Sequence, residues 1–530
     1  MKPKRRGRTC HSGSGAGSWQ GVFFLALFAV FLIASPIFAA EIRSVSVSAA
    51  GNAANGGSSE RGVSGDGRYA TFCSVADNLV PGDTNGTSDV FVKDLFTGSI
   101  GRVSVDSHGR EGNGGCGRTA ISRDGRFVGF ASMADNLVPG DTNGEDDIFV
   151  HDRVTRQTKR VNVGAGGVQA NGPSYEFDLS GDGRYFVFDS DATNLVPGND
   201  NNNSSDVFLR DTQLGTTTRL STGPAGVDAN GGSNQPAISS DGRFVVFASG
   251  ADNLVDGDTN GNDDIFLLDR ESGILERVNV DENGVEANGP NCHGSPSDDG
   301  RYVVFRSGAD NLAPGDLNGI CDIYLRDRVA GTTLLVSRGY GGFAGDGYSS
   351  NGHISGDGRF VLFDSTAPDL VPGDGPGEDV FRYELSTETI SMVSLSPAGL
   401  PGNAASKNPK PSDDGQTVVF ESGATDLVVS DTNGVGDILV SSAVSRWPPC
   451  DQNGDGKFTM VDVNTFRQAC GRKTGGFSCD LDDDGKFRRA DWILFWYGCK
   501  RYPDRATSGG GISVPVKAVE RGGGRLPTSR

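Results

Sequence analysis

Residues that commonly carry out catalysis are scarce in this sequence. It contains only five histidines among 530 residues (His11, His108, His151, His293 and His353), and they share no common pattern. It has no Gly-x-Ser-x-Gly elbow, no phosphate-binding glycine loop and no cluster of zinc ligands. The familiar serine hydrolases, P-loop enzymes and zinc enzymes are therefore not expected.

Long apolar segments are missing as well, with one exception at the N-terminus. Hydrophobic residues make up only 35% of the chain, whereas 79 glycines fit a protein of turns and short strands. The exception is residues 21–33, which follow a basic region and precede the small residues Ala39 and Ala40. This order predicts a secretory signal peptide over residues 1–40, cleaved near Ala39 or Ala40; an uncleaved membrane anchor is the alternative. We expect no membrane span after cleavage, and an exported protein of the extracellular space, cell surface or periplasm.

Positive charge is in short supply. Loss of residues 1–40 removes five basic residues and no acidic one, which leaves 43 Lys and Arg against 68 Asp and Glu, a net charge of −25. Such a charge repels phosphate backbones, so nucleic acid is not an expected partner. The same negative net charge is compatible with calcium binding.

One short phrase recurs through the middle of the chain. Asp-Gly occurs seven times at spacings of 57 to 59 residues, six times as Asp-Gly-Arg, at Asp66, Asp124, Asp182, Asp241, Asp299, Asp357 and Asp414. Each repeat also holds short apolar or alternating runs bounded by Gly, Asn, Asp and Pro, such as residues 244–247, 265–268 and 277–280. With the stretch before each Asp-Gly, every repeat has four predicted strands. The sequence therefore predicts an all-β fold, a seven-bladed β-propeller over residues 41–446.

The two ends of the repeat array complete each other. The last repeat lacks a fourth strand, while residues 42–47 precede the first repeat and read like the fourth strands elsewhere. We expect residues 42–47 to supply the missing strand. A ring closed in this way leaves no unpaired sheet edge. The Asp-Gly-Arg phrase itself is interpreted as a tight turn with a structural role.

The repeat resembles the propeller repeats of TolB-like periplasmic proteins. The resemblance rests on phrases such as residues 122–132 and 147–153, and it spans residues 42–446. It implies the fold, whereas propellers carry out binding, scaffolding and catalysis alike.

Each repeat carries a long polar insert between its second and third strands. Strands alternate in direction, so these inserts are expected on the same rim as the connections between blades. We interpret them as Asx-Gly turns, and a ring of weak calcium sites or of groups that bind a glycan or protein ligand is the alternative. The residues concerned are Asp83, Asn85, Asp89, Asp141, Asn143, Asp147, Asp258, Asn260, Asp264, Asp316, Asn318, Asp322, Asp431, Asn433 and Asp437.

Eight cysteines remain after signal cleavage, an even number in an oxidising compartment. Two pairs fall on the insert rim, and we expect Cys73 to bond with Cys116 and Cys292 with Cys321, with buried free thiols as the alternative. The other four lie within residues 450–499.

Residues 450–499 contain two loops that predict calcium binding. Their oxygen ligands occupy positions 1, 3, 5 and 12, a glycine occupies position 6, and the backbone carbonyl of a lysine is expected at position 7. The two loops keep an offset of 29 residues. The predicted ligands are Asp451, Asn453, Asp455, Lys457 and Asp462 for the first ion, and Asp480, Asp482, Asp484, Lys486 and Asp491 for the second.

This tandem of loop-helix halves resembles a type I dockerin. The resemblance covers residues 447–500 and implies a small α-helical module that folds around two calcium ions and plugs into a cohesin-like or other surface protein. Positions 10 and 11 of the loops, Met460-Val461 and Arg489-Ala490, depart from the family's usual hydroxyl pairs. We favour disulfides Cys450–Cys499 and Cys470–Cys479, although three pairings are open. Residues 501–530 are Gly-rich and are expected to be a disordered tail.

The sequence favours an exported, non-catalytic propeller that binds a ligand or protein partner and is tethered through the dockerin-like module. The alternative is a polysaccharide-degrading enzyme, a hydrolase acting on O-glycosyl compounds, because dockerins commonly accompany such enzymes. No catalytic residue and no organic cofactor can be assigned from the sequence.

Overall fold

The computed structural model describes residues 41–442, apart from residues 199–201, 430 and 432. The predicted signal peptide, the dockerin-like module with its ten calcium ligands and its disulfides, and the tail all lie outside the described residues. Within the described part, no helix is long and apolar enough to cross a membrane.

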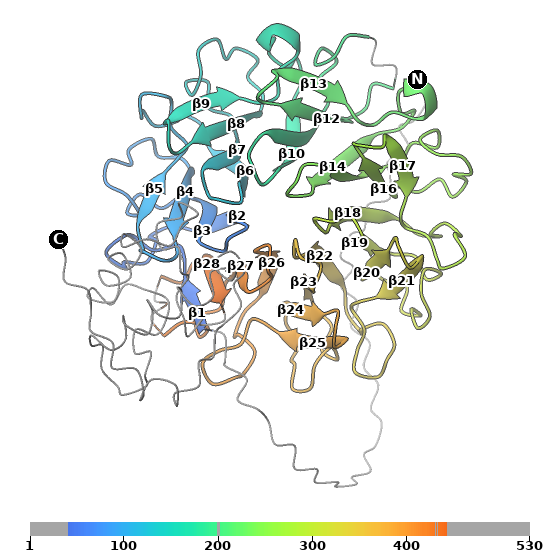
Figure 1. Cartoon of the computed structure of the whole chain (residues 1–530). Coiled ribbons are helices and arrows are strands. Elements are labelled where there is room, and N and C mark those ends of the chain that lie inside the picture. The colour runs from blue at the N-terminus through green and yellow to red at the C-terminus, as the bar shows by residue number, and fades with distance from the viewer. Residues whose placement is uncertain (1–40, 199–201, 430, 432, 443–530) are drawn as a thin grey trace, which may run out of the picture. The chain divides into compact units, whose positions relative to one another are not determined.

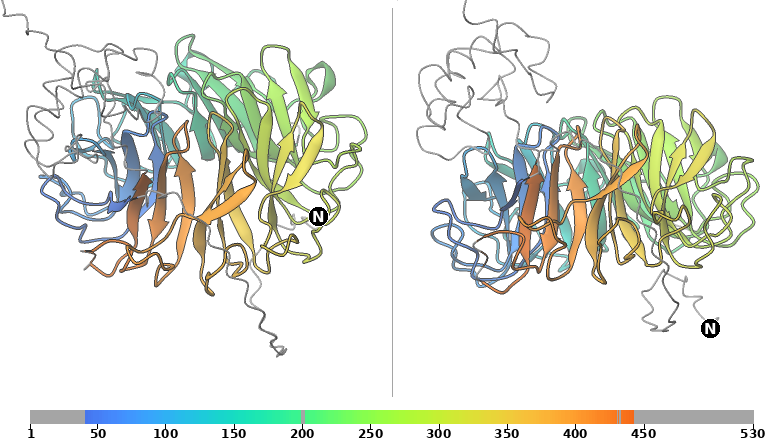
Figure 2. Two further views of the ribbon diagram at one scale, coloured as in Figure 1. Left: turned by 60° about the horizontal axis from the view of Figure 1, so that its bottom comes forward. Right: turned by 90° about the horizontal axis from the view of Figure 1, so that it is seen from below.

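Seven antiparallel sheets of four strands surround a common axis (Figure 1). The side views show the strands running between two rims that carry the loops (Figure 2). In six sheets the strands follow in sequence order, with the first strand nearest the axis. The predicted seven-bladed β-propeller is therefore confirmed.

Most strands have six residues, and the fourth strand of each blade is shorter. Blade 1 holds β2 (Ser58–Val63), β3 (Tyr69–Ser74), β4 (Asp89–Asp94) and β5 (Ile100–Arg102). Blade 2 holds β6 (Cys116–Ile121), β7 (Phe127–Ser132), β8 (Asp147–Asp152) and β9 (Gln157–Arg160). Blade 3 holds β10 (Ser174–Leu179), β11 (Tyr185–Ser190), β12 (Asp206–Asp211) and β13 (Thr216–Arg219). Blade 4 holds β14 (Ser233–Ile238), β15 (Phe244–Ser249), β16 (Asp264–Asp269) and β17 (Ile274–Arg277).

The remaining blades follow the same plan. Blade 5 holds β18 (Asn291–Pro296), β19 (Tyr302–Ser307), β20 (Asp322–Asp327) and β21 (Thr332–Leu335). Blade 6 holds β22 (Ser349–Ile354), β23 (Phe360–Ser365), β24 (Asp379–Glu384) and β25 (Thr389–Met392). Blade 7 holds β26 (Ser406–Pro411), β27 (Thr417–Ser422) and β28 (Asp437–Ser442), completed by β1 (Glu41–Ser44). Two short 3-10 turns, η1 (Ala165–Gly167) and η2 (Pro224–Gly226), lie in connections between blades.

The N-terminal strand closes the ring as expected. β1 pairs antiparallel with β28, and the two strands lie side by side in Figure 1. The strand is shorter than the predicted residues 42–47, because Val47 turns away into a bridge with Ala53. Beyond the strand, Ser46 Oγ donates a hydrogen bond of 2.5 Å to the carboxylate of Asp437. The closure therefore combines a strand pair with a buried side-chain contact.

The hydrophobic core lies between the blades. The second and third strands are almost wholly buried, because each blade is covered on both faces by its neighbours. In blade 1 the rings of Phe72 and Phe91 lie 5.7 Å apart, and equivalent aromatic pairs recur in blades 2 to 6. Full burial of each such ring contributes roughly 2–3 kcal/mol. This explains the runs of apolar residues after each Asp-Gly.

The Asp-Gly-Arg phrase builds the turn between the first two strands. Asp124 accepts hydrogen bonds from Ser122 Oγ (2.8 Å) and from the backbone N–H of Arg126 (2.9 Å). Gly125 has a φ of +72°, which favours glycine. The Arg126 guanidinium pairs with Asp152 and covers the ring of Phe127. The phrase repeats for structural reasons, as the sequence interpretation proposed.

Candidate functional site

The insert loops share a rim with the connections between blades, as predicted. Asn85 Nδ2 donates to Asp89 and to the backbone carbonyl of Gly112 in the connection, while Asn85 Oδ1 accepts from the N–H of Thr87. This is an Asx turn that ties the insert to the next connection. Equivalent contacts are made by Asn143, Asn260, Asn318 and Asn433.

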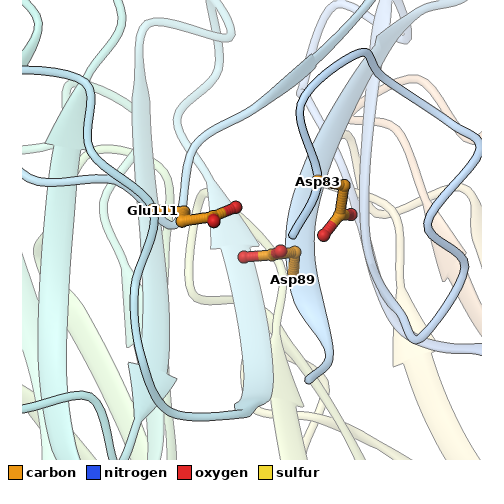
Figure 3. A group of neighbouring side chains, drawn as sticks. All are labelled: Asp83, Asp89 and Glu111. Carbon is orange, nitrogen blue, oxygen red and sulfur yellow. The ribbon is translucent and has the colours of Figure 1, made fainter. Parts of the chain in front are cut away.

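Carboxylates of the insert and the connection gather in two blades. Asp83, Asp89 and Glu111 point toward one another in blade 1 (Figure 3), and Asp258, Asp264 and Glu286 do so in blade 4. In blade 1, Nη1 of Arg102 lies 3.3 Å from Asp83, 3.0 Å from Asp89 and 2.8 Å from Glu111. The guanidinium thus supplies the positive charge that these carboxylates require, and a cation at the same point must compete with it.

The other rim groups vary around the ring. Arg160 pairs with Asp141 and Asp147, Arg219 with Asp206 and Asp228, and Arg277 with the blade 4 carboxylates. In blade 5 the Tyr324 hydroxyl donates to Asp316 instead. In blades 5 and 6 the position of the rim arginine is taken by Leu335 and Met392, which lie opposite Tyr324 and Phe381. Calcium binding at the rim stays a prediction.

One of the two expected disulfides on this rim forms. Cys73 and Cys116 are bonded, with a Cα–Cα distance of 6.2 Å. Cys292 is a free thiol, so the expected bond between Cys292 and Cys321 is wrong. The reason is that Cys292 Sγ faces Arg306, whose Nε lies at 3.0 Å and Nη2 at 2.7 Å.

The innermost strands carry a ring of residues that the sequence analysis missed. A β-bulge shifts the register in all seven first strands, the innermost of each blade, around one residue that lies six positions before the Asp-Gly. Five of these residues have a φ between +49° and +58°, which is uncommon for non-glycine residues. The ring consists of Glu60, Arg118, Glu176, Gln235, His293, Asn351 and Asn408.

Electrostatic interactions across the ring place further charges at the axis. Lys410 of blade 7 interacts with Asp178 of blade 3, which lies on the other side of the propeller. His353 of blade 6 interacts with Lys410 and with His293 of blade 5. These groups lie on innermost strands and influence one another's protonation through space, and we call Asp178, His293, His353 and Lys410 the axial cluster.

The axial cluster contains a buried polar atom without a partner among the described residues. Nδ1 of His293 is buried and makes no hydrogen bond. Burial lowers the pKa of Lys410 to about 8 and that of His293 to about 3. By contrast, Arg61 pairs with Glu421 at 2.8 Å and Arg118 with Glu176 at 2.5 Å.

Backbone groups join the blades at the Asp-Gly rim. Arg123 N–H donates to the carbonyl of Gly181 at 2.8 Å, and this pattern continues from blade to blade. A Cβ on Gly65 would lie 2.4 Å from Asp413, so the contacts here are close. The residues of this ring are Gly65, Arg123, Gly181, Ser240, Asp298, Gly356 and Asp413. These hydrogen bonds connect neighbouring blades at this rim.

A cavity of about 270 Å³ lies toward the opposite rim, at the first strands of blades 3 to 5. Glu176 and Gln235 link it to the axial residues: Glu176 pairs with Arg118, and Gln235 Oε1 accepts from the N–H of His293. Its lining is rich in polar groups, namely Tyr175, Glu176, Asp189, Asn234, Gln235, Asp263, Asn291, Cys292 and Arg306, with Pro290. A larger cavity of about 390 Å³ on the outer side of blades 3 and 4 has mostly aliphatic and glycine lining, and fewer polar groups converge on it. The polar cavity is the better candidate site.

Two titratable side chains of the cavity have unusual surroundings. Burial, followed by the nearby Glu176 carboxylate, raises the pKa of Asp189 to about 7. Asp189 Oδ1 accepts the backbone N–H of Glu176 at 2.9 Å. Burial also raises the pKa of the Cys292 thiol. The site therefore holds a carboxyl group that is partly protonated near neutral pH.

A positional signal for these residues exists in the sequence. Each ring residue of the bulges lies six positions before an Asp-Gly, and Asp178, His353 and Lys410 lie four before. Asp189 and Arg306 lie seven after. At the offsets four before and seven after, these blades carry a charged residue or histidine where others carry a small residue, such as Gly62, Ala120 and Ala131.

Comparisons with known proteins concern the fold. No family model matches the sequence, and no curated protein matches it. Among solved structures, TolB from Acinetobacter baumannii is 17% identical with a TM-score of 0.34, over 56% of this chain and 60% of that one. Oligogalacturonate lyase from Vibrio parahaemolyticus is 13% identical (TM-score 0.44, 72% and 88% covered). The β-propeller domain of the Trilobed protease from Pyrococcus furiosus is 10% identical (TM-score 0.45, 73% and 95% covered). The seven-bladed all-β propeller itself is established by the sheet topology.

Proposed function

We propose that this chain is an exported propeller that binds a ligand at the axis, through the polar cavity and the axial cluster, without transforming it. The observation that carries the proposal is the set of buried polar groups without partners. An unpaired buried imidazole or amide costs free energy, so such groups persist where a ligand or water meets them. His293 Nδ1 is of this kind, and so is Oδ1 of Asn291, which lines the cavity.

The cavity lining suits a polar ligand such as a glycan or a peptide. Asn234 and Gln235 each offer an amide that donates and accepts, and Tyr175, 47% exposed, offers an aromatic face. A few convergent polar groups beside an aromatic ring fix the orientation of a bound ligand. The rim of inserts around the axis then serves as the structural frame of the site.

We further propose that the dockerin-like module tethers the propeller. Its two calcium loops, ending at Asp462 and Asp491, are expected to fold on binding two ions and to dock onto a cohesin-like or other surface protein. The signal peptide predicted over residues 1–40 supports export of the mature protein. The propeller and the module thus have separate roles, ligand binding and attachment.

One observation favours the alternative of a polysaccharide-degrading enzyme. Asp189 and Glu176 line the same cavity, and the pKa of Asp189 is raised to about 7 by burial and by Glu176. Glycoside hydrolysis uses a protonated carboxyl group as acid beside an ionised carboxylate. In this alternative Asp189 donates the proton and Glu176 is the carboxylate.

The test is ligand binding by the full mature chain on arrays of glycans and peptides. Tyr175→Ala should weaken binding of a captured ligand at least about tenfold, the loss expected for a central aromatic contact. Tyr340→Ala is the matched control, because Tyr340 is 73% exposed in a connection away from the cavity. Equal binding by both variants contradicts the axial site. Release of shortened glycans that disappears in Asp189→Asn would favour the enzyme.

A further inference from the structure

Asn291 of the polar cavity departs from its equivalents in the other blades. It is the first residue of β18, a position that serine takes in blades 1, 3, 4, 6 and 7. Each of those serines makes a hydrogen bond with a serine of the second strand, as Ser58 does with Ser74 at 3.0 Å. Asn291 instead directs its Nδ2 to the backbone carbonyls of Asp263 and Gly289, each at 2.9 Å. These two bonds fix the orientation of the amide, so the remaining atom, Oδ1, is an acceptor.

Oδ1 of Asn291 is a buried acceptor without a partner among the described residues. Asn291 is only 2% exposed, and it lines the cavity. The charged donor of the lining, Arg306, is turned to Cys292 Sγ and to the Tyr348 hydroxyl. A buried amide oxygen that accepts nothing costs free energy. A ligand in the cavity is therefore expected to bring a hydrogen-bond donor to Asn291.

Carboxylates outnumber positive charges in the lining. Glu176, Asp189 and Asp263 line the cavity, together with the single guanidinium of Arg306. Glu176 is paired with Arg118 at 2.5 Å. Two carboxylates then remain beside one guanidinium, so one negative charge is in excess when both carboxylates are ionised. A single cation in the cavity balances this charge.

We propose that the cavity binds the ammonium group of an amino sugar, with Asn291 Oδ1 and the Asp263 carboxylate as its acceptors. This inference rests on the proposed ligand-binding function and names the chemistry of the ligand. An ammonium group offers three N–H groups and no acceptor, and its hydrogen bonds to a carboxylate are charge-assisted. It thus supplies both the donor for Asn291 and the positive charge.

The protonation of the two carboxylates supports a cation at this place. Burial, followed by the Asp264 carboxylate, raises the pKa of Asp263. Burial, followed by the Glu176 carboxylate, raises the pKa of Asp189 to about 7. Both shifts favour the neutral form, whereas a positive charge nearby favours the ionised form. A bound ammonium therefore stabilises both ionised carboxylates, and a bound anion would destabilise them further.

The rest of the lining fits a sugar better than a lysine side chain of a peptide. Asn234 and Gln235 offer amides that donate and accept, as sugar hydroxyls require, and Tyr175 offers an aromatic face. A lysine carries its ammonium on a four-carbon stem that packs along apolar surface, which the lining offers chiefly at Pro290. The cavity of about 270 Å³ is slightly smaller than pockets for drug-sized ligands, roughly 300–1,000 Å³, and so suits one sugar residue.

The experiment is calorimetric titration of the full mature chain at pH 7 with two ligands, the β-1,4-linked trisaccharide of glucosamine and its fully N-acetylated form. Acetylation converts each ammonium into a neutral amide and leaves the rest of the sugar unchanged. We expect the charged trisaccharide to bind at least about tenfold more tightly, because acetylation removes a charge-assisted hydrogen bond. A lysine residue with both backbone ends blocked represents the peptide source and should bind more weakly than the charged trisaccharide.

Two variants test the residues that are assigned to the ammonium. Asp263→Asn keeps the shape of the side chain and removes its charge, so it should abolish the preference for the charged trisaccharide. Asp252→Asn is the matched control, because Asp252 is an exposed residue of the same blade outside the lining, and it should bind as the wild type does. Asn291→Ser introduces the residue of five other blades and should weaken binding of the charged trisaccharide at least about tenfold. Thermal unfolding of each variant checks its folding.

Several results would overturn the inference. These are the absence of binding or equal binding of the two trisaccharides, tighter binding of the blocked lysine, and an unchanged preference in Asp263→Asn or an unchanged affinity in Asn291→Ser. If one of these occurs while Tyr175→Ala still weakens binding of a captured glycan or peptide, only the amino-sugar inference fails. If Tyr175→Ala has no effect either, the proposed axial function fails with it.

Discussion

Arg61 and Glu421 stand 360 residues apart in the chain and form an ion pair of 2.8 Å. Their side chains are only 10% and 13% exposed, and the pair joins blade 1 to blade 7 next to the axis. Glu421 also accepts the N–H of Glu60, and Arg61 Nε donates to the carbonyl of Asn408. The seam of the ring is thus fastened twice, by the β1–β28 strand pair outside and by this ion pair inside.

Loss of the inner ion pair should destabilise the propeller. Glu421→Gln leaves the buried Arg61 without its carboxylate, and removal of one partner of a buried pair costs about 3–5 kcal/mol. Denaturant unfolding of the full chain measures the loss. The control is Glu388→Gln, because the pair Arg338–Glu388 is more exposed and should contribute less than about 1 kcal/mol. Equal effects of the two variants would contradict the role of the inner pair.

The rim arginines provide a second test. Arg277→Met leaves Asp258, Asp264 and Glu286 without their cation, so the free energy of unfolding should fall by about 3 kcal/mol. Added calcium should then raise the unfolding temperature of the variant, because three carboxylates that lie within 4.8 Å of one another are free to bind it. Arg338→Met, from the exposed pair, should show no calcium response. Failure of calcium to stabilise Arg277→Met would show that these carboxylates cannot hold a divalent cation.

The dockerin-like loops predict a defined calcium stoichiometry. The full mature chain should bind two ions tightly, and Asp451→Ala with Asp480→Ala should abolish both, because position 1 of each loop is lost. Calorimetric titration after chelation gives the count. Asp83→Ala in the propeller serves as the control and should leave both ions bound. Tight calcium binding that survives the double substitution would contradict the module.

Asp189 predicts how stability depends on pH. The pKa of Asp189 in the folded state is raised to about 7. Its contribution to the free energy of unfolding is therefore fully present below the unfolded pKa near 4 and is lost as pH rises through 7. Asp189→Asn removes this loss, so the variant should gain stability relative to wild type between pH 4 and 7, by at most about 4 kcal/mol. Unfolding free energies across this range provide the measurement. Asp191→Asn, an exposed neighbour, should not change the profile, and a pH-independent difference for Asp189→Asn would refute the expectation.

The architecture could be read from the sequence because it repeats. Asp-Gly turns, apolar strand runs and the extra strand before the first repeat are each fixed by local chemistry. Cys73 near the end of a second strand and Cys116 at the start of the next blade fall on the same rim. Cys292 and Cys321 also looked paired, but the side chain of Arg306 decides the direction of the thiol, and that contact is tertiary. The axial cluster could not be read for the same reason: Asp178 of blade 3 and Lys410 of blade 7 interact only across the closed ring.

The most direct test of the axial site uses Cys292 as a reporter. Cys292 is a free thiol that lines the cavity, so a ligand bound there should shield it. The measurement is the rate of alkylation of Cys292 in the full mature chain, followed by peptide mass spectrometry, with and without a saturating ligand from the arrays. Axial binding predicts that alkylation slows at least about tenfold as the site fills, because a shielded thiol reacts only from the free fraction. An unchanged rate at saturation would contradict the central claim and place the ligand elsewhere on the protein.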